Sequence, residues 1–447
     1  MHSAPANGER KTLTKRDVLR IAREREVRFV RLTFVDILGI SKNVTIPASE
    51  LERAIEGAIT FDGGSIDGFV RGEEADMILR PDLATFAVHP WTASGAVEAR
   101  VICDIATPDG EPFEGCPRTT LRRAVEDARD VLSGLATALE VEFYLFDVGT
   151  DGTPLTSSTD VGSYFDLSAG DRGENARIEM VTALESMGIA VASAHHEHGA
   201  GQHEIDVKDA PVLTTADTLM TIRTVAKHVA ARHGLHATFM PKPLESLAGS
   251  GIHVYCTLPP QPDDAREHGE LPEDLLFAIG GLLAHAPAFT AVCNPTVNSY
   301  KRLVAAWDAP IYTVWSRRSA NSLVRVPAGA GPTRLEVRSA DPSCNPYLAL
   351  AVLVASAADG VRAHTLPGDA LTGSTYELSE RDRSERRIRT LPKSLRQALD
   401  ELDRDAVVRA ALGDHIFHAF RDAKLAEYER YRRAVHPWER EAYFRVY

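Results

Sequence analysis

The sequence lacks the features that would assign it to a secreted, zinc-binding or membrane-spanning class. Its five cysteines are scattered and none belongs to a C-x-x-C pair, so neither a disulfide framework nor a zinc site is indicated. The N-terminal residues MHSAPANGERK have no apolar stretch after their charges, unlike a signal peptide. The most apolar run, residues 347–358, is shorter than the roughly 20 residues that a membrane helix needs. We therefore expect a soluble, cytoplasmic protein without a membrane partner.

Positive charge is also in deficit. Lys and Arg total 50 against 63 Asp and Glu, which gives a formal net charge of −13 at pH 7. A surface of this sign repels nucleic acid and anionic membranes, which leaves small molecules or other proteins as partners. The chain has 447 residues, of which 44% are hydrophobic. This length predicts two domains, or one large domain with a smaller one attached.

Local patterns predict a chain of mixed helices and strands. Thr14, followed three residues later by Asp17, is expected to begin a helix over residues 12–25, and alternating apolar residues make VRFVRLTF a strand. Ser49 is expected to cap a short helix, and Pro117 to occupy the first turn of another. Further helices are expected over residues 174–187, 215–233, 272–288 and 345–362.

Acidic side chains gather in two segments. The first, ALEVEFYLF over residues 138–146, alternates so that Glu140 and Glu142 share one face of a strand while apolar residues face the core. The second, AHHEHGAGQHEID over residues 194–206, adds three more acids and four histidines. Oxygen donors at this density suit Mg²⁺ or Mn²⁺ better than zinc.

Five further motifs occur with these two segments. They are FDGGSIDGFVR, GSGIH, NPTVNSYKRL, RLEVRSADPSCNPYLAL and VHPWERE. Together, and in this order from about residue 27 to the C-terminus, they resemble the type I glutamine synthetase family. The resemblance implies an α+β fold, with a small N-terminal β-grasp domain over residues 22–110 and a large catalytic domain over residues 116–447 that contains a curved antiparallel sheet. It also implies a homo-dodecamer of two stacked hexameric rings.

The resemblance implies a set of metal ligands. One divalent ion is expected at Glu142, Glu197 and Glu204, and another at Glu140, His253 and Glu336. Two or three Mg²⁺ or Mn²⁺ ions per site would neutralise the carboxylates and the phosphates of ATP.

Substrate-binding residues follow from the same resemblance. L-Glutamate and its phosphorylated γ-carboxyl group are assigned to Arg302 and Arg338, with Gly249 beside them. ATP is assigned to Tyr255, Thr257, Arg325 and Arg334. The base that deprotonates the amine is assigned to Asp62, contributed by a neighbouring subunit, with Ser65, Tyr164 and Glu197 around it. Asp308 is assigned to the loop that closes over the site.

Several positions depart from the family pattern. A serine is replaced by Gly64, an asparagine by Ala248, the glutamate of the closing loop by Asp308, and an arginine by Ala320. At the nucleotide end, Ala192 replaces a glutamate and Asp209 an aromatic residue. Three functions stay open for this reason: a glutamine synthetase that uses ammonia, a γ-glutamyl ligase that uses another small amine, and a catalytically weak or regulatory relative. Tyr376 aligns roughly with a tyrosine that is modified in one subclass, but we expect an ordinary exposed loop tyrosine there.

Overall fold

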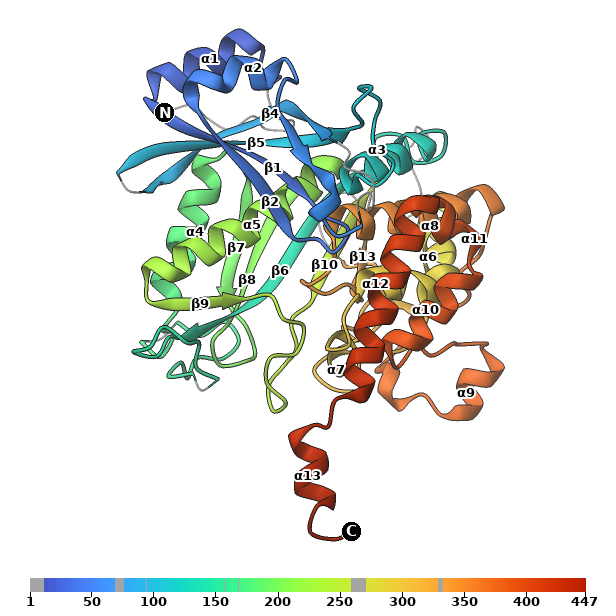
Figure 1. Cartoon of the computed structure of the whole chain (residues 1–447). Coiled ribbons are helices and arrows are strands. Elements are labelled where there is room, and N and C mark those ends of the chain that lie inside the picture. Colours follow the sequence, from blue (N-terminus) through green and yellow to red (C-terminus); the bar gives the residue numbers. More distant parts are fainter. Residues whose placement is uncertain are drawn as a thin grey trace.

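The computed structural model describes residues 12–68, 76–93, 95–156, 158–167, 169–258, 271–328 and 333–447. Two sheets organise the chain. One has five strands and lies near the N-terminus, and the other has eight strands and lies in the remainder of the chain. Helices surround both sheets (Figure 1). The arrangement confirms the predicted α+β class.

The small sheet has the order β2-β1-β5-β4-β3. Its strands are β1 (Val27–Val35), β2 (Ser41–Pro47), β3 (Thr60–Asp62), β4 (Asp76–Ala93) and β5 (Ala96–Ala106). β1 pairs with β5 in parallel and with β2 in antiparallel orientation. The apolar residues of β1 that alternate in the sequence, Val30, Leu32 and Phe34, are buried as predicted. They form a core with α1 (Lys15–Glu24) and α2 (Leu51–Ile55).

Of the two helix starts predicted in the small domain, the structure confirms the one at Thr14 but not the one at Ser49. Thr14 caps α1, and Asp17 completes the capping box by accepting from the Thr14 backbone. Ser49 does not cap α2, which corrects our expectation. It lies inside the 3-10 turn η1 (Ala48–Glu50), and α2 begins after Glu50 without a side-chain cap, because η1 already leads the backbone into the helix.

The large sheet has the order β11-β12-β13-β10-β6-β8-β7, and β9 also pairs with β6. Its strands are β6 (Ala136–Asp147), β7 (Val191–His196), β8 (Gln202–Pro211), β9 (Leu235–Thr238), β10 (Ile252–Thr257), β11 (Trp315–Ser316), β12 (Val324–Arg325) and β13 (Arg334–Val337). Every pair except β11 with β12 is antiparallel. One face packs on the main hydrophobic core, and the other face carries the polar side chains described below.

The helices of the large domain mostly agree with prediction. They are α3 (Pro117–Asp127), α4 (Glu174–Ser186), α5 (Val212–Arg232), α6 (Glu273–Cys293), α7 (Ser299–Arg302), α8 (Pro346–Ala363), α9 (Glu380–Glu385), α10 (Leu395–Arg404), α11 (Ala406–Leu412), α12 (Asp414–Arg433) and α13 (Pro437–Tyr443). The large domain also contains the 3-10 turn η3 (Thr375–Glu377), and the small domain contains η2 (Gly63–Ser65). Pro117 begins α3 as expected. α6 continues beyond the predicted end at residue 288, because Phe289, Val292 and Cys293 are buried in the core and outweigh the helix-breaking tendency of Pro287.

α6 and α8 are long and apolar enough to cross a membrane by length and composition, although the sequence suggested no such segment. In each helix, 78% of the apolar window is buried inside the protein. The two helices pack against one another, and a Cβ added at Gly281 or Gly360 would lie 2.2 Å from a backbone oxygen of the opposite helix. Both are therefore core helices that need glycine at their contact.

A buried ion-pair cluster joins the two domains. Arg118 at the start of α3 binds Asp217 of α5 at 2.9 Å, and also Asp82 and Asp104 of the small domain at 2.6 and 2.9 Å. The Arg118 side chain is only 4% exposed. Three carboxylates around one buried guanidinium fix the orientation of the small domain on the large one.

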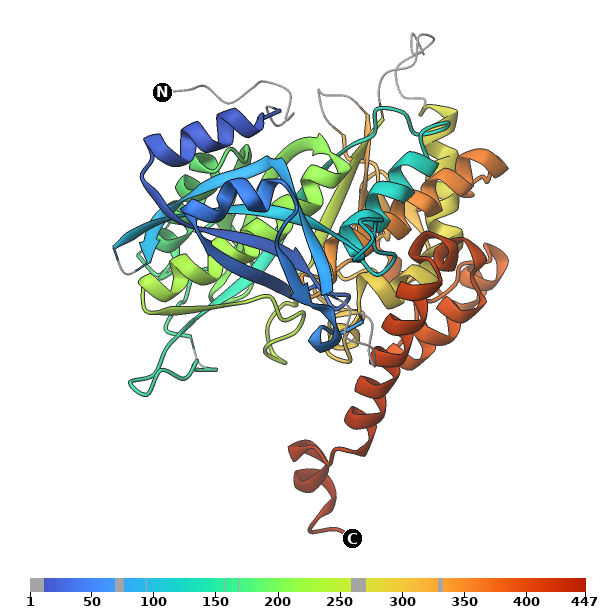
Figure 2. The same cartoon turned by 45° about the horizontal axis from the view of Figure 1, so that its top comes forward.

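α13 projects from the body of the protein at the C-terminus (Figure 1, Figure 2). Large apolar side chains on and after this helix are exposed, among them Trp438, Phe444, Val446 and Tyr447. In both views α13 lies apart from the two sheets.

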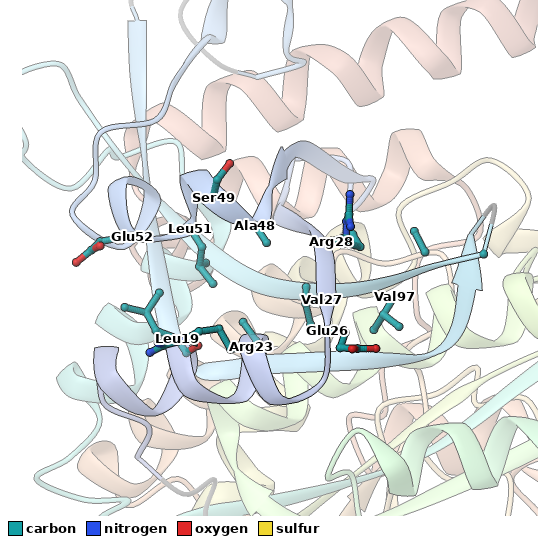
Figure 3. A pocket seen from close by; sticks show the side chains of 13 residues that line it. Leu19, Arg23, Glu26, Val27, Arg28, Ala48, Ser49, Leu51, Glu52 and Val97 are labelled. Carbon is teal, nitrogen blue, oxygen red and sulfur yellow. Dashed lines mark hydrogen bonds between the residues drawn. The ribbon is translucent and has the colours of Figure 1, made fainter.

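A groove of about 790 Å³ lies on the small domain, between α1, the turn before α2 and the start of β5. Figure 3 shows its mixed lining, with Leu19 and Val27 beside Arg23, Glu26 and Glu52. None of the site residues that the sequence predicts lines this groove.

Candidate active site

A second cavity, of about 460 Å³, lies over the polar face of the large sheet. Eleven of the predicted site residues line it: Glu140, Glu142, Tyr164, Glu197, Glu204, Gly249, His253, Arg302, Asp308, Arg325 and Arg338. The structure thus brings together residues that are spread over about 200 positions of the sequence.

Strand register places the acids beside one another. In β6, Glu140 lies opposite Asp206 of β8 on one side and opposite His253 of β10 on the other. Glu142 lies opposite Glu204 of β8. Directly opposed residues on antiparallel strands have Cβ atoms about 4.5–5.5 Å apart, so this register alone puts the carboxylates in reach of one shared cation.

Polar partners hold the two β6 carboxylates in place. Glu140 Oε2 lies 2.7 Å from His253 Nδ1, and the Tyr255 hydroxyl donates to Glu140 Oε1. Glu142 Oε2 accepts from Gln202 Nε2 at 2.9 Å and from the Gly251 backbone N–H at 3.0 Å. Both oxygens of Glu140 and one oxygen of Glu142 are therefore oriented by protein groups.

The electrostatics of the cluster favour a cation. Burial and the neighbouring Glu142 carboxylate raise the pKa of Glu197 to about 8. Burial, followed by Glu142, also raises the pKa of Glu204 well above its usual range. Burial opposes ionisation of Glu140, but the hydrogen bond with His253 prevails and lowers the pKa of Glu140 to about 2. Crowded, buried carboxylates of this kind are stable in ionised form when a cation lies between them.

Two groups of side chains that line the cavity could each hold a metal ion. In one, ligand atoms of Glu140, Glu204 and His253 all lie within 4.8 Å of one another, and in the other those of His195, Glu197 and Glu204 do so. Five of the six predicted ligands are therefore in or beside these groups, since Glu142 Oε1 lies 3.6 Å from His253 Nε2. The grouping differs from the predicted pairing, because Glu204 is shared and His195 contributes.

Glu336, the sixth predicted ligand, has a different environment. It is fully buried, and its two oxygens pair with Arg325 and Arg338. Glu336 Oε1 lies 3.6 Å from His253 Nδ1. Its role as a metal ligand stays a prediction, since in this structure it orients two arginines of the cavity.

Arg338 also offers a free donor. Its Nε is buried and has no hydrogen-bond partner among the described residues. A buried guanidinium N–H without a partner is costly and favours an anionic ligand in the cavity beside it.

Arg302 enters the cavity from α7 and is tightly enclosed. Its Nη1 donates to the Ser339 carbonyl at 2.8 Å and its Nη2 to the Arg338 carbonyl at 3.1 Å. A Cβ at Gly249 would lie 2.8 Å from Arg302 Cγ, and one at Gly251 would lie 2.5 Å from Nη2. The two glycines of the GSGIH motif therefore leave the space that this side chain occupies.

The predicted nucleotide residues lie at the far ends of β10 and β13. The Arg334 guanidinium stacks over the Tyr255 ring at 4.1 Å from its centre, and Thr257 Oγ1 donates to Asp209 at 3.0 Å. Together with Arg325 they extend the polar face beyond the acidic cluster, but Tyr255, Thr257 and Arg334 do not line the cavity in the described part of the chain.

Asp62 and Ser65 lie elsewhere, on the small domain at the end of β3. Asp62 accepts from the Gly64 backbone at 2.7 Å and from the Ser65 hydroxyl at 3.4 Å. Among the described residues of this one chain, neither reaches the cavity lining. Their assignment to a neighbouring subunit's site stays a prediction.

Sequence reasoning assigned no role to several residues of the cavity. His195 Nε2 lies 3.1 Å from Glu204 Oε1, and Gln202 orients Glu142. Asp206 and Trp307 also line the cavity. The sequence did hold a signal for Gln202 and Asp206. Together with Glu204 they occupy every second position of β8 and so share one face of the strand.

Known proteins resemble this chain over almost its whole length. The family described as "Glutamine synthetase, beta-Grasp domain" matches residues 26–108, and the one described as "Glutamine synthetase, catalytic domain" matches residues 114–443. A glutamine synthetase from Thermus thermophilus is 45% identical over 444 residues, covering 97% of this chain and 99% of its own length. The chain belongs to the glutamine synthetase family. A glutamine synthetase from Clostridium saccharobutylicum, 43% identical over 97% of this chain and 99% of its own, agrees with this.

Solved structures have the same fold. A complex of GmaS with ADP has a TM-score of 0.86 and 29% identity, covering 96% of this chain and all of that chain. The glutamine synthetase of Plasmodium falciparum has a TM-score of 0.85 at 21% identity, covering 97% of this chain and all of that one, and shows the fold alone.

Proposed function

We propose that this protein is a ligase that uses ATP to amidate the γ-carboxyl group of L-glutamate with ammonia. In the first step the carboxylate takes the γ-phosphoryl group of ATP, giving γ-glutamyl phosphate and ADP. In the second step ammonia attacks the acyl carbon and phosphate leaves. The observation that carries the proposal is the cavity lined by both an acidic cluster and the arginines Arg302 and Arg338, in a chain of this family.

The donor set fits divalent cations. Glu140, Glu197 and Glu204 with two histidines offer mainly hard oxygen ligands, and the raised pKa values of Glu197 and Glu204 reveal unbalanced negative charge. We assign Mg²⁺ or Mn²⁺, two or three per site, to this cluster. When bound, these ions would neutralise the carboxylates and phosphate oxygens that must approach one another.

The arginines supply the remaining positive charge. Arg302 is held rigidly by two backbone carbonyls, which suits it to fix the position of a carboxylate of L-glutamate. Arg338, with its unpartnered buried Nε, is placed to meet the charge that develops on the transferred phosphoryl group. Arg325, Arg334, Tyr255 and Thr257 are assigned to ATP on the adjoining part of the sheet.

The ammonium end of the site is assigned to Asp308, Tyr164 and Glu197 in this chain, and to Asp62 and Ser65 of a neighbouring copy. A carboxylate near the amine can accept the proton that ammonium must lose before it attacks. The exposed apolar surface of α13 supports an assembly, for which we propose two stacked hexameric rings.

A phosphate-release assay tests the proposal. The purified protein is given ATP, Mg²⁺ or Mn²⁺ and L-glutamate, and phosphate release is compared with ammonia, with a panel of primary amines and with no acceptor. Ammonia is expected to give the highest kcat/KM. A primary amine with a higher kcat/KM than ammonia would replace ammonia as the acceptor. The panel includes such amines because the Asp308 side chain is shorter than the glutamate expected from the family. Absence of phosphate release with every acceptor would refute the enzymatic function.

A further inference from the structure

Tyr376 lies outside the cavity, in η3, but its hydroxyl reaches the loop that forms one wall of the cavity. The hydroxyl donates to the Ala309 carbonyl at 2.8 Å and lies 3.3 Å from the Ala306 carbonyl. The residues between these two carbonyls, Trp307 and Asp308, line the cavity. The side chain is half-buried, which corrects the expectation of an exposed loop tyrosine.

The loop held by this hydroxyl has an unfavourable backbone. The Ala309 N–H donates to the Ala306 carbonyl at 3.2 Å and closes a four-residue turn. Both central residues have positive φ, +54° at Trp307 and +56° at Asp308. Glycine and asparagine adopt this conformation readily, whereas a tryptophan does so at a cost. Contacts from outside the turn must therefore stabilise it.

η3 is a firm support for the tyrosine. Its cap Ser374 accepts from Asn321 Nδ2 at 3.0 Å, and the Thr375 N–H donates to Asn321 Oδ1 at 3.0 Å. Asn321 is buried, and nearby the Leu371 N–H donates to the Trp315 carbonyl in β11 at 2.9 Å. The hydroxyl of Tyr376 is thus connected through η3 to the edge of the large sheet.

We propose that Tyr376 is a positioning residue that holds the 306–309 turn in its left-handed conformation over the cavity, so that Asp308 faces the acceptor and the turn keeps water out. This inference rests on the proposed function. Without the hydroxyl, the turn can relax to a conformation with negative φ, which moves Trp307 and Asp308 together. The hydrogen bonds of the Tyr376 hydroxyl go to the turn, so its removal is expected to change metal and glutamate binding less than the acceptor end of the site.

The test is Tyr376→Phe, which removes one oxygen atom. We expect the KM for ammonia to rise about fivefold, the change that corresponds to one neutral hydrogen bond. We also expect ATP hydrolysis with glutamate but without ammonia to rise by a similar factor, because water then reaches the acyl phosphate. The KM for glutamate and the affinity for Mn²⁺ should stay within about twofold of wild type.

The matched control is Tyr312→Phe. The Tyr312 hydroxyl accepts from Arg383 Nη1 at 3.1 Å, and Tyr312 does not line the cavity. Removing this hydroxyl should therefore leave the KM for ammonia and the rate of ATP hydrolysis without ammonia unchanged. A Tyr376→Phe protein whose ammonia KM and uncoupled hydrolysis match wild type would overturn the inference. Equal losses in every parameter, with a lower melting temperature, would also overturn it in favour of a purely structural role.

A second background tests the mechanism directly. Trp307→Gly makes the positive φ inexpensive, so adding Tyr376→Phe to it should change the ammonia KM by less than twofold. The same fivefold effect in both backgrounds would refute stabilisation of the turn. A wild-type protein that releases no phosphate with any acceptor would instead refute the proposed function, which keeps the two failures distinct.

Discussion

Gly251→Ala tests the placement of Arg302 without changing Arg302 itself. An added Cβ would lie 2.5 Å from Arg302 Nη2 and 3.2 Å from Cζ, closer than side-chain carbons approach other atoms. Because Gly251 does not have positive φ, alanine fits its backbone. The guanidinium must then retreat by roughly 1 Å to restore normal contact distance.

Two independent estimates give the size of the effect. Displacement of the Arg302 guanidinium first breaks its 3.1 Å hydrogen bond from Nη2 to the Arg338 carbonyl. A hydrogen bond from a charged group contributes about 1.5–3 kcal/mol. A displacement of about 1 Å at a positioning residue can likewise cost about 100-fold in rate. We expect kcat/KM for glutamate to fall about 10- to 100-fold, with ATP binding little changed.

The assay is phosphate release at varied glutamate and saturating ATP and ammonia, with thermal unfolding measured in parallel. Ile252→Val is the control, because Ile252 neighbours Gly251 but belongs to the hydrophobic core, and loss of one methyl group costs about 0.5–1.5 kcal/mol of stability. If Gly251→Ala lowers stability like the control yet keeps wild-type kcat/KM for glutamate, the assignment of Arg302 is wrong.

Three further predictions concern the metal cluster, the domain interface and the C-terminus. Glu204→Gln, which alters the carboxylate shared by both metal groups, should weaken Mn²⁺ binding by at least tenfold in calorimetry, and unchanged affinity would exclude Glu204 as a ligand. Burial in the domain interface lowers the pKa of His89 to about 4. Between about pH 4 and 6.5 the unfolded state therefore binds more protons than the folded state, and the free energy of unfolding should fall by about 3 kcal/mol as the pH falls through this window. Denaturant unfolding of His89→Phe should lose that part of the pH dependence, and an unchanged slope would contradict the assignment. A chain ending at Arg433 should sediment as a smaller species with reduced activity, whereas an intact assembly would show that α13 is not required.

The local features of the fold could be predicted from the sequence. The alternation at residues 138–146 depends only on the two-residue period of a strand, and it correctly placed Glu140 and Glu142 on one face with Val141 and Phe143 in the core. The capping box at Thr14 is equally local, since it involves residues three positions apart. Such features do not depend on the rest of the chain.

Contacts between distant segments could not be predicted in this way. Nothing in the local pattern of β10 says that His253 lies opposite Glu140, because strand register is set by the packing of the whole sheet. The same is true of Tyr376, whose partners in the 306–309 turn are about 70 residues away. The place of Glu204 in both candidate metal groups likewise follows from the pairing of four strands, β6, β7, β8 and β10, and not from spacing along one of them.

Three of the departures from the family pattern have a common location that the sequence order conceals, whereas Gly64 lies in η2 on the small domain. Ala248, Asp308 and Ala320 come from three separate loops, yet all three line the same cavity. Each has a smaller side chain than the residue that we expected from the family, so together they enlarge the part of the cavity near Arg302 and the 306–309 turn. The acidic face of β6, β8 and β10 is complete by contrast. Because the acidic cluster belongs to the sheet while these three residues lie on loops, we predict that they change the choice of acceptor more than phosphorylation of glutamate, which the phosphate-release assay with ammonia and primary amines measures.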